Sequence, residues 1–459
     1  MNILILGAGQ VGSELTEILS EDGHSITLVD LIEEKLEKES EQHDIKIVCG
    51  NCCYPQTLED ANIQDTELAI AMTEYDEVNL VACQMIKHLN KKTRTMARIR
   101  AREYLKGKGS QIFENGEYSI DVLISPETLI TEYISKLVQL PGALQVLDFG
   151  DGRASMVSVK AVEGAPITGH KVSELREHIP NADTRVAAIY REEEIIIPSG
   201  DDYIKDGDEV FFISAKGNIK KVMSEIRPRD SKYKNIMIAG GGKIGRRLAK
   251  ILEDKFSVVK IIEKSRKRGD YLSENLDSAL VLNGDSTDED FLIEEGIDSI
   301  DMFCAVTNSD EANVMSSLLA KKLGAKKVLS LMNKQSFLDL IHQGEVDITV
   351  IPNEITIGVV LKNITKAKIE RAHTFKKGKS EALELIASPE TTPKIIGQGI
   401  DDIKLPNGCT ISAVIRGKEV KIAHHDVKIH EDDHIIIFLS DKKLFPALET
   451  SLMLSLIHI

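Results

Sequence analysis

The amino-acid sequence predicts an α/β protein made by tandem duplication: two Rossmann-like parallel-sheet domains, each followed by a small α+β domain. A glycine-rich turn follows an apolar strand twice, as ILILGAGQVG at residues 3–12 and as IMIAGGGKIG at 236–245. Apolar strands and helical stretches alternate after each turn, which favours a right-handed βαβ series and a parallel sheet. Short strands separated by turns then follow each series, so the small domain is duplicated as well.

Each large domain is expected to hold strands in matching order. They are NILILG, SITLVD, IKIVCG, LAIAMT and RTMARIR in the first half, and NIMIAG, SVVKIIE, ALVLNG, MFCAVT and KVLSLM in the second. Helical spacing of apolar residues follows the first turn, as with Val11, Leu15 and Leu19. The second strand of each half ends on a carboxylate, Asp30 or Glu263, at the same distance from the glycine turn.

The change of pattern along the chain sets the expected domain boundaries. They are 1–124 and 232–350 for the large domains, and 143–228 and 369–453 for the small ones. Helical connectors follow the large domains and begin at Pro126 and Pro352, since proline suits the first turn of a helix. The last residues, SLMLSLIHI, are apolar without a helical pattern and are left out of the prediction.

The chain is acidic, with 57 Lys and Arg against 73 Asp and Glu and a formal net charge of −16 at pH 7. This charge disfavours docking on nucleic acid or on an anionic lipid surface. The sequence shows neither a leader-like segment nor a long apolar run, so we expect a cytoplasmic protein that reaches a membrane only through a protein partner. The six cysteines are few, and we expect free thiols.

The glycine-rich turns are typical of dinucleotide-binding sites. The first glycine permits the tight turn, the second lets the backbone approach a pyrophosphate, and the third lets the helix pack on the strand. The phosphates would lie on the helix N-terminus, and the acidic residue at the end of the second strand would bind a ribose hydroxyl. These roles fall to Gly7, Gly9, Gly12 and Asp30 in the first half and to Gly240, Gly242, Gly245 and Glu263 in the second. The acidic residues favour NAD over NADP, a preference that Lys264 and Arg266 weaken in the second half.

A second motif, T-x-x-D-E-x-N, ends a strand in both halves, at residues 73–79 and 307–313. Ligands bind at this carboxyl edge of an open α/β sheet, so we expect Thr73 and Thr307 to contact the ligand. We expect Asp76 and Asp310 to cap the helices that follow, because apolar residues at helical spacing begin directly after them.

Two arginines distinguish the halves. Arg98 and Arg100 lie at the end of a strand, where a guanidinium group reaches a phosphate or forms an exposed ion pair. Their aligned positions in the second half, Leu331 and Asn333, are uncharged. The two sites are therefore expected to differ in affinity or in ligand.

Neither a metal site nor a catalytic site is expected. The segment CGNCCYP holds Cys49, Cys52 and Cys53, with His43 upstream, but this ligand set is incomplete and the second half replaces it with NGDSTDE. The small domains offer no general base combined with a substrate-binding arginine. Two cofactor sites without evident chemistry indicate a sensor rather than an enzyme.

The motifs resemble the tandem RCK family, also called KTN, whose TrkA members are the regulatory subunits of bacterial Trk potassium-uptake systems. The similarity covers nearly the whole chain and includes ILGAGQVG, TEYDEVNLVACQ, ARIR, LPGALQV, DTRVAAIYR, GDEVFFI, GGGKIG, AVTNSDEAN and LAKKLGAKKV. By this resemblance the large domains are RCK N-terminal domains and the small domains are RCK C-terminal domains.

The resemblance implies a subunit that binds NAD or NADH, with ATP and ADP as further candidates, and gates potassium uptake by conformational change. The implied cofactor-binding residues are Gly7, Ala8, Gly9, Gln10, Val11, Gly12, Asp30, Thr73, Glu74 and Arg98 in the first half, and Gly240, Gly241, Gly242, Lys243, Ile244, Gly245, Glu263, Thr307 and Asn308 in the second. One departure stands out: the family's common Gly-Asp pair is kept as Gly284 and Asp285 but becomes Gly50 and Asn51 in the first half.

The implied partners are a Trk-type potassium-translocating membrane subunit and further copies of the chain, as a dimer or a tetrameric ring, with no nucleic acid. The chain would then lie on the cytoplasmic face of the inner membrane, held there by its partner. Two alternatives remain: an NAD-dependent dehydrogenase, which the missing catalytic constellation disfavours, and a regulator of potassium efflux, which would share every site.

Overall fold

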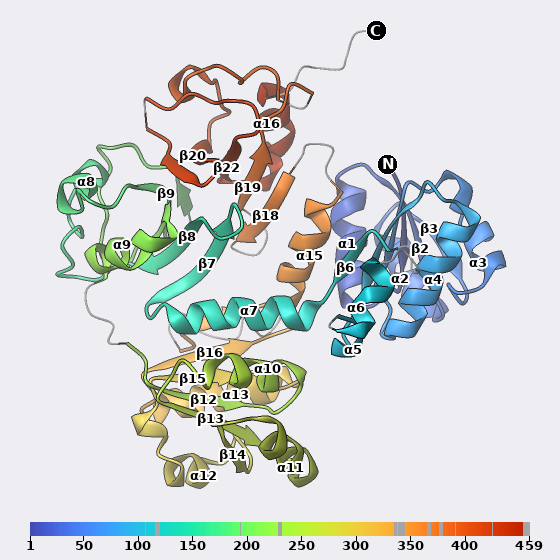
Figure 1. Ribbon diagram of the computed structural model, residues 1–459, viewed down its shortest axis with the longest axis horizontal. Helices are drawn as coiled ribbons and strands as arrows, with labels where there is room; N and C mark the ends of the chain where they lie inside the picture. Colours follow the sequence, from blue (N-terminus) through green and yellow to red (C-terminus); the bar gives the residue numbers. More distant parts are fainter. Residues whose placement is uncertain are drawn as a thin grey trace. The chain divides into compact units, whose positions relative to one another are not determined.

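The computed structural model describes residues 1–459 except 106, 115–119, 193, 228–231, 335–336, 338–344, 365–368, 376–379, 391, 425 and 453–459. Within the described residues the chain forms two six-stranded parallel sheets and two five-stranded antiparallel sheets (Figure 1). The predicted α/β fold with a tandem duplication is therefore confirmed. Most of the apolar C-terminal segment lies outside the described residues.

The first parallel sheet has the strand order β3-β2-β1-β4-β5-β6. Its strands are β1 (Asn2–Leu6), β2 (Ser25–Asp30), β3 (Lys46–Cys49), β4 (Leu68–Ala71), β5 (Arg94–Arg98) and β6 (Val122–Ile124). Its helices are α1 (Gln10–Glu21), α2 (Glu33–Gln42), α3 (Pro55–Asp60), α4 (Asp76–Leu89), α5 (Arg102–Leu105) and α6 (Lys108–Glu114), and α7 (Pro126–Gln139) leads out of it. The central strands β1 and β4 are apolar and almost wholly buried, as expected where helices cover both faces. The strand order reverses between β1 and β4, and ligands bind at such a switch point.

The second parallel sheet repeats this topology with the order β14-β13-β12-β15-β16-β17. Its strands are β12 (Asn235–Ala239), β13 (Val258–Glu263), β14 (Leu280–Asn283), β15 (Met302–Ala305), β16 (Lys327–Leu331) and β17 (Ile348–Val350). Its helices include α10 (Lys243–Leu252), α11 (Arg266–Asn275), α12 (Glu289–Glu294) and α13 (Asp310–Lys322), and α15 (Pro352–Lys362) follows it. The predicted strands and the two helices that begin at prolines are confirmed, and each sheet gains a short sixth strand that was not predicted.

The small domains hold matching antiparallel sheets, with the orders β10-β9-β11-β8-β7 and β18-β19-β22-β20-β21. The first is made of β7 (Ala143–Phe149), β8 (Ala154–Lys160), β9 (Thr184–Arg191), β10 (Glu194–Ile196) and β11 (Glu209–Ala215), with helices α8 (Leu175–His178) and α9 (Ile219–Ile226). The second is made of β18 (Ile369–Phe375), β19 (Ser380–Ile386), β20 (Cys409–Arg416), β21 (Glu419–Ile422) and β22 (His434–Leu439), with helix α16 (Phe445–Leu452).

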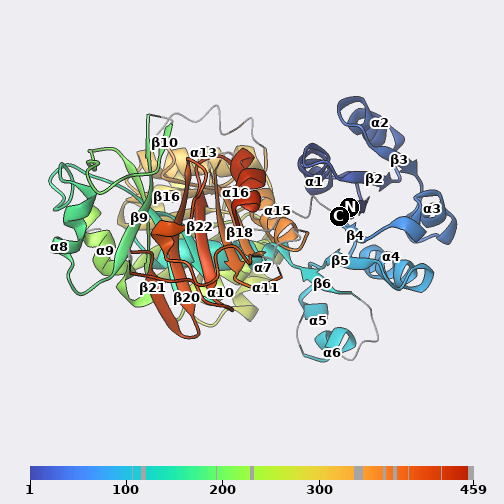
Figure 2. The same cartoon turned by 90° about the horizontal axis from the view of Figure 1, so that it is seen from above.

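The two small sheets share one hydrophobic core, in which buried residues of β8, β9 and β11 pack with those of β19, β20 and β22. The rings of Phe211 and Phe438 meet there, with their centroids 5.8 Å apart. Figure 2 shows the second small sheet, in red, beside β9 of the first. A buried carboxylate adds a polar contact, because Glu384 accepts a hydrogen bond from the N–H of Gly150 at 3.0 Å. Each small sheet thus buries one face against the other copy.

All six cysteines are free thiols, as expected. Burial raises the pKa of Cys83 and of Cys304 to about 12, so both remain protonated at neutral pH. Among the described residues, no helix is long and apolar enough to cross a membrane.

A buried ion pair occurs at the same place in each small domain. Arg191 binds Asp208 through two N–O contacts of 2.6 and 2.7 Å, and Arg416 binds Asp433 through two of 2.7 and 2.8 Å. Asp208 is 2% exposed and Asp433 is fully buried. Each carboxylate also accepts a backbone N–H from the turn three residues before it. The pair therefore joins that turn to the neighbouring strand.

We expect Asp208→Asn and Asp433→Asn each to lower the free energy of unfolding by about 1.5 to 3 kcal/mol, because the buried carboxylate loses its charge-assisted hydrogen bonds to a half-buried arginine. Urea unfolding of the full chain, followed by circular dichroism, measures this effect. The control is Asp201→Asn, since Asp201 pairs with Lys171 at an exposed position. A loss of stability in the control as large as in the two buried variants would contradict the prediction.

Candidate functional site

The first glycine turn joins β1 to α1 at the carboxyl edge of the sheet. Gly7 has a φ of 107°, which side-chain-bearing residues rarely adopt. A Cβ on Gly12 would lie 1.9 Å from the carbonyl oxygen of Gly7, so only glycine permits this packing. A Cβ on Gly9 would meet nothing within 4 Å, and Gly9 is exposed. The turn is thus closed against the sheet at Gly7 and Gly12 but open to an incoming ligand at Gly9.

Gly9 is also the N-cap of α1 and offers no side chain to the first N–H groups of the helix. The first turn of α1 contains no acidic residue. Unbonded N–H groups together with the helix dipole attract an anion, so this end of α1 suits a phosphate.

Asp30, at the end of β2, binds the glycine turn directly. Its Oδ2 accepts a hydrogen bond from the N–H of Ala8 at 2.7 Å, and its Oδ1 accepts one from the N–H of Ile32 at 2.9 Å. The carboxylate therefore fixes the shape of the turn, in addition to the ribose contact expected from the sequence. This supporting role was missed, although the recurrence of an acidic residue in both halves pointed to the position.

Asn79, at the end of the T-x-x-D-E-x-N motif, fastens the end of β4 to the end of β5. It is fully buried. Its Oδ1 accepts hydrogen bonds from the N–H and the hydroxyl of Thr73, at 3.0 and 2.7 Å. Its Nδ2 donates to the carbonyl oxygens of Thr73 and Arg98, at 3.2 and 2.9 Å. Thr73 is held at the switch point, but its hydroxyl is already engaged by Asn79.

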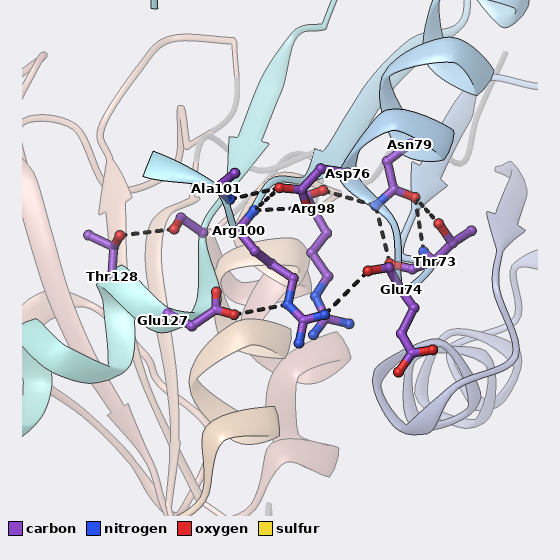
Figure 3. Close-up of polar contacts among 10 residues, drawn as sticks. Thr73, Glu74, Asp76, Asn79, Arg98, Arg100, Ala101, Glu127 and Thr128 are labelled. Carbon is purple, nitrogen blue, oxygen red and sulfur yellow. Dashed lines mark hydrogen bonds and ion pairs between the residues drawn. The ribbon is translucent and has the colours of Figure 1, made fainter. Parts of the chain in front are cut away.

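The expectation that Asp76 caps α4 is wrong. The N-cap is Tyr75, and Asp76 is the first helical residue. Its carboxylate accepts hydrogen bonds from the N–H groups of Arg100 and Ala101, at 2.9 and 2.7 Å (Figure 3). The side chain therefore bonds to the loop after β5 and satisfies two of its backbone N–H groups. Asp76 thus shapes the loop that carries Arg100.

Arg98, the last residue of β5, and Arg100, in the loop that follows, form different contacts. Arg100 Nε lies 2.9 Å from Glu127 Oε1, and its Nη1 donates to the carbonyl oxygen of Glu74 at 3.3 Å. Arg98 Nε is buried and has no partner among the residues that the structure describes. Burial, followed by the charge of Arg100, lowers the pKa of Arg98. The two positive charges, labelled in Figure 3, thus act on each other, and an anion bound by both arginines would offset the desolvation of Arg98 and the repulsion between the two charges.

The second half repeats these bonds. Glu263 Oε2 accepts from the N–H of Gly241 at 3.0 Å, as Asp30 does from Ala8. Asn313 accepts from the N–H and hydroxyl of Thr307 at 2.8 and 2.7 Å, and donates to the carbonyl oxygen of Leu331 at 2.9 Å. Gly245 packs as Gly12 does, since a Cβ added to Gly245 would lie 1.8 Å from the carbonyl oxygen of Gly240.

Asp310 shows the same departure from prediction as Asp76. It accepts hydrogen bonds from the N–H groups of Asn333 and Lys334, at 3.0 and 2.8 Å. The helix cap is Ser309, whose hydroxyl accepts from the N–H of Ala312. The expected capping role of Asp310 is therefore also wrong.

The positive charge of the second half lies elsewhere. Leu331, buried in β16, takes the position of Arg98, and Asn333 takes that of Arg100. Arg268 of α11 supplies a guanidinium group instead. Its Nε donates to the carbonyl oxygen of Gly241 at 2.8 Å, and its Cζ lies 4.7 Å from the centroid of the Tyr271 ring. This arginine was not singled out from the sequence.

The loop after the third strand also differs between the halves. Asp285 pairs with Lys264 at 2.8 Å, and this hydrogen bond, with those from Thr287, lowers its pKa to about 2. Asn51 stands in the corresponding loop of the first half and accepts from the N–H of Cys53. In the second half the positive charge of Lys264 is thus balanced by Asp285.

The other residues singled out by the sequence also line the two turns. Their burial differs: Gln10, Glu74, Lys243 and Asn308 are exposed, Val11 and Ile244 are half-buried, and Ala8 and Gly241 are buried. Their backbones lie in the first helical turns or at the strand ends that form the two sites. The structure therefore gathers the predicted residues of each half at one sheet edge.

Comparison with known proteins agrees with this geometry. The TrkA-N domain family matches residues 3–126 and 236–352, and the TrkA-C domain family matches 156–227 and 385–444. The Trk system potassium uptake protein TrkA of Halomonas elongata is 46% identical over 444 residues, and that of Vibrio alginolyticus is 44% identical, each alignment covering 96% of both chains. The solved structure described as the GsuK channel bound to NAD matches with a TM-score of 0.62 at 17% identity, covering 98% of this chain and 78% of that chain.

Substitutions at the open and at the packed glycines of each turn are expected to affect different properties, ligand binding in the first case and stability in the second. Gly9→Ala and Gly242→Ala should change the free energy of unfolding by less than about 1 kcal/mol, because a Cβ fits there. Each should weaken NADH binding in its own half about tenfold or more, since the Cβ occupies the path of the pyrophosphate. Calorimetric titration and thermal unfolding of the full chain measure the two effects.

Gly12→Ala and Gly245→Ala form the contrasting set. They should destabilise the chain by about 1 to 3 kcal/mol, because the helix must move away from the turn. Equal destabilisation by Gly9→Ala and Gly12→Ala would contradict the assignment of Gly9 to the ligand.

Proposed function

This chain belongs to the TrkA family, and we propose that it is the nucleotide-binding regulatory subunit of a Trk-type potassium-uptake system. The observation that carries the proposal is the pair of glycine turns, each open at its middle glycine and each bonded to an acidic side chain. The full-length similarity to TrkA proteins named for potassium uptake supports the transport role.

The ligand we propose is NAD or NADH, with ATP and ADP as competing adenine nucleotides. Asp30 and Glu263 accept hydrogen bonds from a ribose 2′-hydroxyl and repel a 2′-phosphate, which favours the unphosphorylated dinucleotide. A solved channel of the same fold is described as bound to NAD, which supports this ligand class. The residues fit the group, because the N–H groups of the first turn of α1 receive no capping side chain and Arg98 Nε has no hydrogen-bond partner among the described residues, so both can bind an anion.

In the first site, Gly9 and the first turn of α1 bind the pyrophosphate, Asp30 binds the ribose, and Thr73 and Glu74 line the side opposite Asp30. Arg98 binds a phosphate oxygen. In the second site Gly242 and Glu263 repeat these roles, whereas Arg268 supplies the cation. We propose that the two sites bind nucleotides with different affinity, because the positively charged side chain comes from β5 in the first site and from α11 in the second.

The first site is linked to the helix that leads out of its domain. Arg100 is bonded to Glu127, in the first turn of α7, and the loop that carries Arg100 is held by Asp76. A phosphate that draws Arg100 towards Arg98 competes with Glu127 for the same guanidinium group. Nucleotide binding thereby biases the start of α7, and a ligand acts as a switch only through this difference between the two arrangements.

We propose that the chain is not an enzyme. In the small domains, where a dehydrogenase would hold its substrate residues, each sheet packs one face on the other sheet and the second sheet packs its other face on its own helix α16. The chain would act at the cytoplasmic face of the inner membrane, bound to its potassium-translocating partner, and as a homo-oligomer that is either a dimer or a tetrameric ring.

Replacing Arg98 tests the first site directly. Arg98→Met should weaken NADH binding to the first half by about 10- to 100-fold, because a charge-assisted hydrogen bond is worth about 1.5 to 3 kcal/mol. The matched control is Arg94→Met at the opposite end of the same strand. Titration calorimetry on a Gly242→Ala background isolates the first site, and equal affinity in both arginine variants would contradict the role of Arg98.

The proposed function is tested by potassium uptake in cells that carry the Trk-type membrane subunit. We expect the chain to co-purify with that subunit, and NADH or ATP to change the uptake rate only while the glycine turns are intact. Gly9→Ala/Gly242→Ala should remove the response without removing the complex. Oxidation of NADH with a small substrate would favour a dehydrogenase instead, and co-purification with an efflux system would favour a regulator of potassium efflux.

A further inference from the structure

The first small domain carries a cluster of two histidines and two glutamates that plays no part in the proposed function. His170 and Glu174 flank the turn before α8, His178 is the last residue of α8, and Glu225 lies in α9. One potential ligand atom from each of His170, Glu174 and His178 lies within 4.8 Å of the others. Glu225 lies outside this group of three but borders it, because its Oε2 is 3.5 Å from His178 Nδ1.

The backbone that carries these side chains is fixed by hydrogen bonds. The N–H of His170 donates to the carbonyl oxygen of Ile167, and the N–H of Ile204 donates to that of His170, both at 3.1 Å. The N–H of Ile167 donates to the carbonyl oxygen of Glu225 at 3.2 Å, which ties this turn to α9. Leu175, the first residue of α8, is buried and anchors the helix. The four side chains therefore project from a framework that holds them near one another.

The spacing and exposure of the cluster suit a cation. His170 Nδ1 lies 2.8 Å from Glu174 Oε2, so an imidazole nitrogen and a carboxylate oxygen already face each other. The side chains of His170 and His178 are 50% and 29% exposed, so an ion from solvent reaches both rings. The ring centroids lie 5.7 Å apart.

We propose that His170, Glu174, His178 and Glu225 bind one divalent transition-metal ion, and that Zn²⁺ fits best. Neutral imidazole nitrogens combined with carboxylate oxygens are a donor set that Zn²⁺ accepts in a four-coordinate site. Ca²⁺ and Mg²⁺ prefer oxygen donors throughout and are disfavoured by two imidazoles. A bound ion would connect α8 to α9 on the outer side of the first small domain.

The second small domain provides an internal comparison. The N–H of Gln398 donates to the carbonyl oxygen of Ile395 at 3.1 Å, which is the bond that His170 makes to Ile167. Gln398 is therefore the structural counterpart of His170. Asp402 is the counterpart of Glu174, because its N–H donates to the carbonyl oxygen of Gly399 just as the N–H of Glu174 donates to that of Lys171. The second small domain therefore has the same turn but no imidazole at this position. One ion per chain is expected.

Zinc titration of the full-length protein, followed by calorimetry, tests the site. We expect one Zn²⁺ per chain, with affinity lowered about 100-fold by His170→Gln and by His178→Gln, since even indirect partners of a metal are worth about 10- to 100-fold. The control His88→Gln removes an exposed histidine of α4 and should bind as the parent does. Glu225→Gln supplies a further variant on a different helix, in case either histidine variant fails to fold.

Cobalt absorption separates this site from the thiols near Cys49. Co²⁺ bound by nitrogen and oxygen shows no thiolate-to-cobalt charge-transfer band, whereas binding at Cys49, Cys52 and Cys53 would show one. A thiolate band, unchanged zinc affinity in the histidine variants, or no saturable binding would each overturn the proposal. NADH binding measured on the same samples keeps this outcome distinct from the nucleotide sites.

Discussion

The buried amides of Asn79 and Asn313 are the constraint on which both candidate sites depend. Each amide uses its oxygen and its nitrogen to join the ends of two adjacent parallel strands at the switch point of its sheet. Parallel strands leave backbone groups unpaired where they diverge into loops, and a buried unpaired group costs about 1 to 3 kcal/mol. The asparagine satisfies those groups and also holds the threonine that faces the glycine turn. The bonds of Asp76 and Asp310 extend the same arrangement to the following loop.

Duplication preserved this framework and changed the charges placed on it. The glycine turn, its bond to an acidic side chain and the asparagine bonds recur in both halves, although the acidic residue is Asp30 in one and Glu263 in the other. The guanidinium group, in contrast, comes from β5 in one half and from α11 in the other. The small domains show the same division: both keep the buried Arg–Asp pair, but only the first has histidine at the turn before α8. Backbone-satisfying side chains are costly to lose, while exposed ones are free to diverge.

The sequence was sufficient for the parts of the structure that follow local patterns. Alternating apolar segments and repeated glycines predicted the parallel strands, the fold class and the helices that begin at Pro126 and Pro352. The strands β6 and β17 have only three residues each, too few for a recognisable period. Asp76 was misassigned because a helix cap and a long-range acceptor have the same local sequence, and only the loop after β5 distinguishes them. The bond from Arg268 to Gly241 and the approach of Glu225 to His178 join distant segments, which no spacing rule encodes.

The size of the proposed switch follows from the competition for Arg100. Its bond to Glu127 is charge-assisted and partly shielded from water, since the side chain of Glu127 is 10% exposed. Such a bond is worth about 1.5 to 3 kcal/mol, so exchanging it for a phosphate shifts the balance between two arrangements by about 10- to 100-fold at most. A shift of that size, repeated in each copy of an assembly, is enough to change a transporter from mostly closed to mostly open. The second half has Asn333 at this position and lacks the competing pair, so in the proposed mechanism its nucleotide adds binding energy without the same effect on the connecting helix.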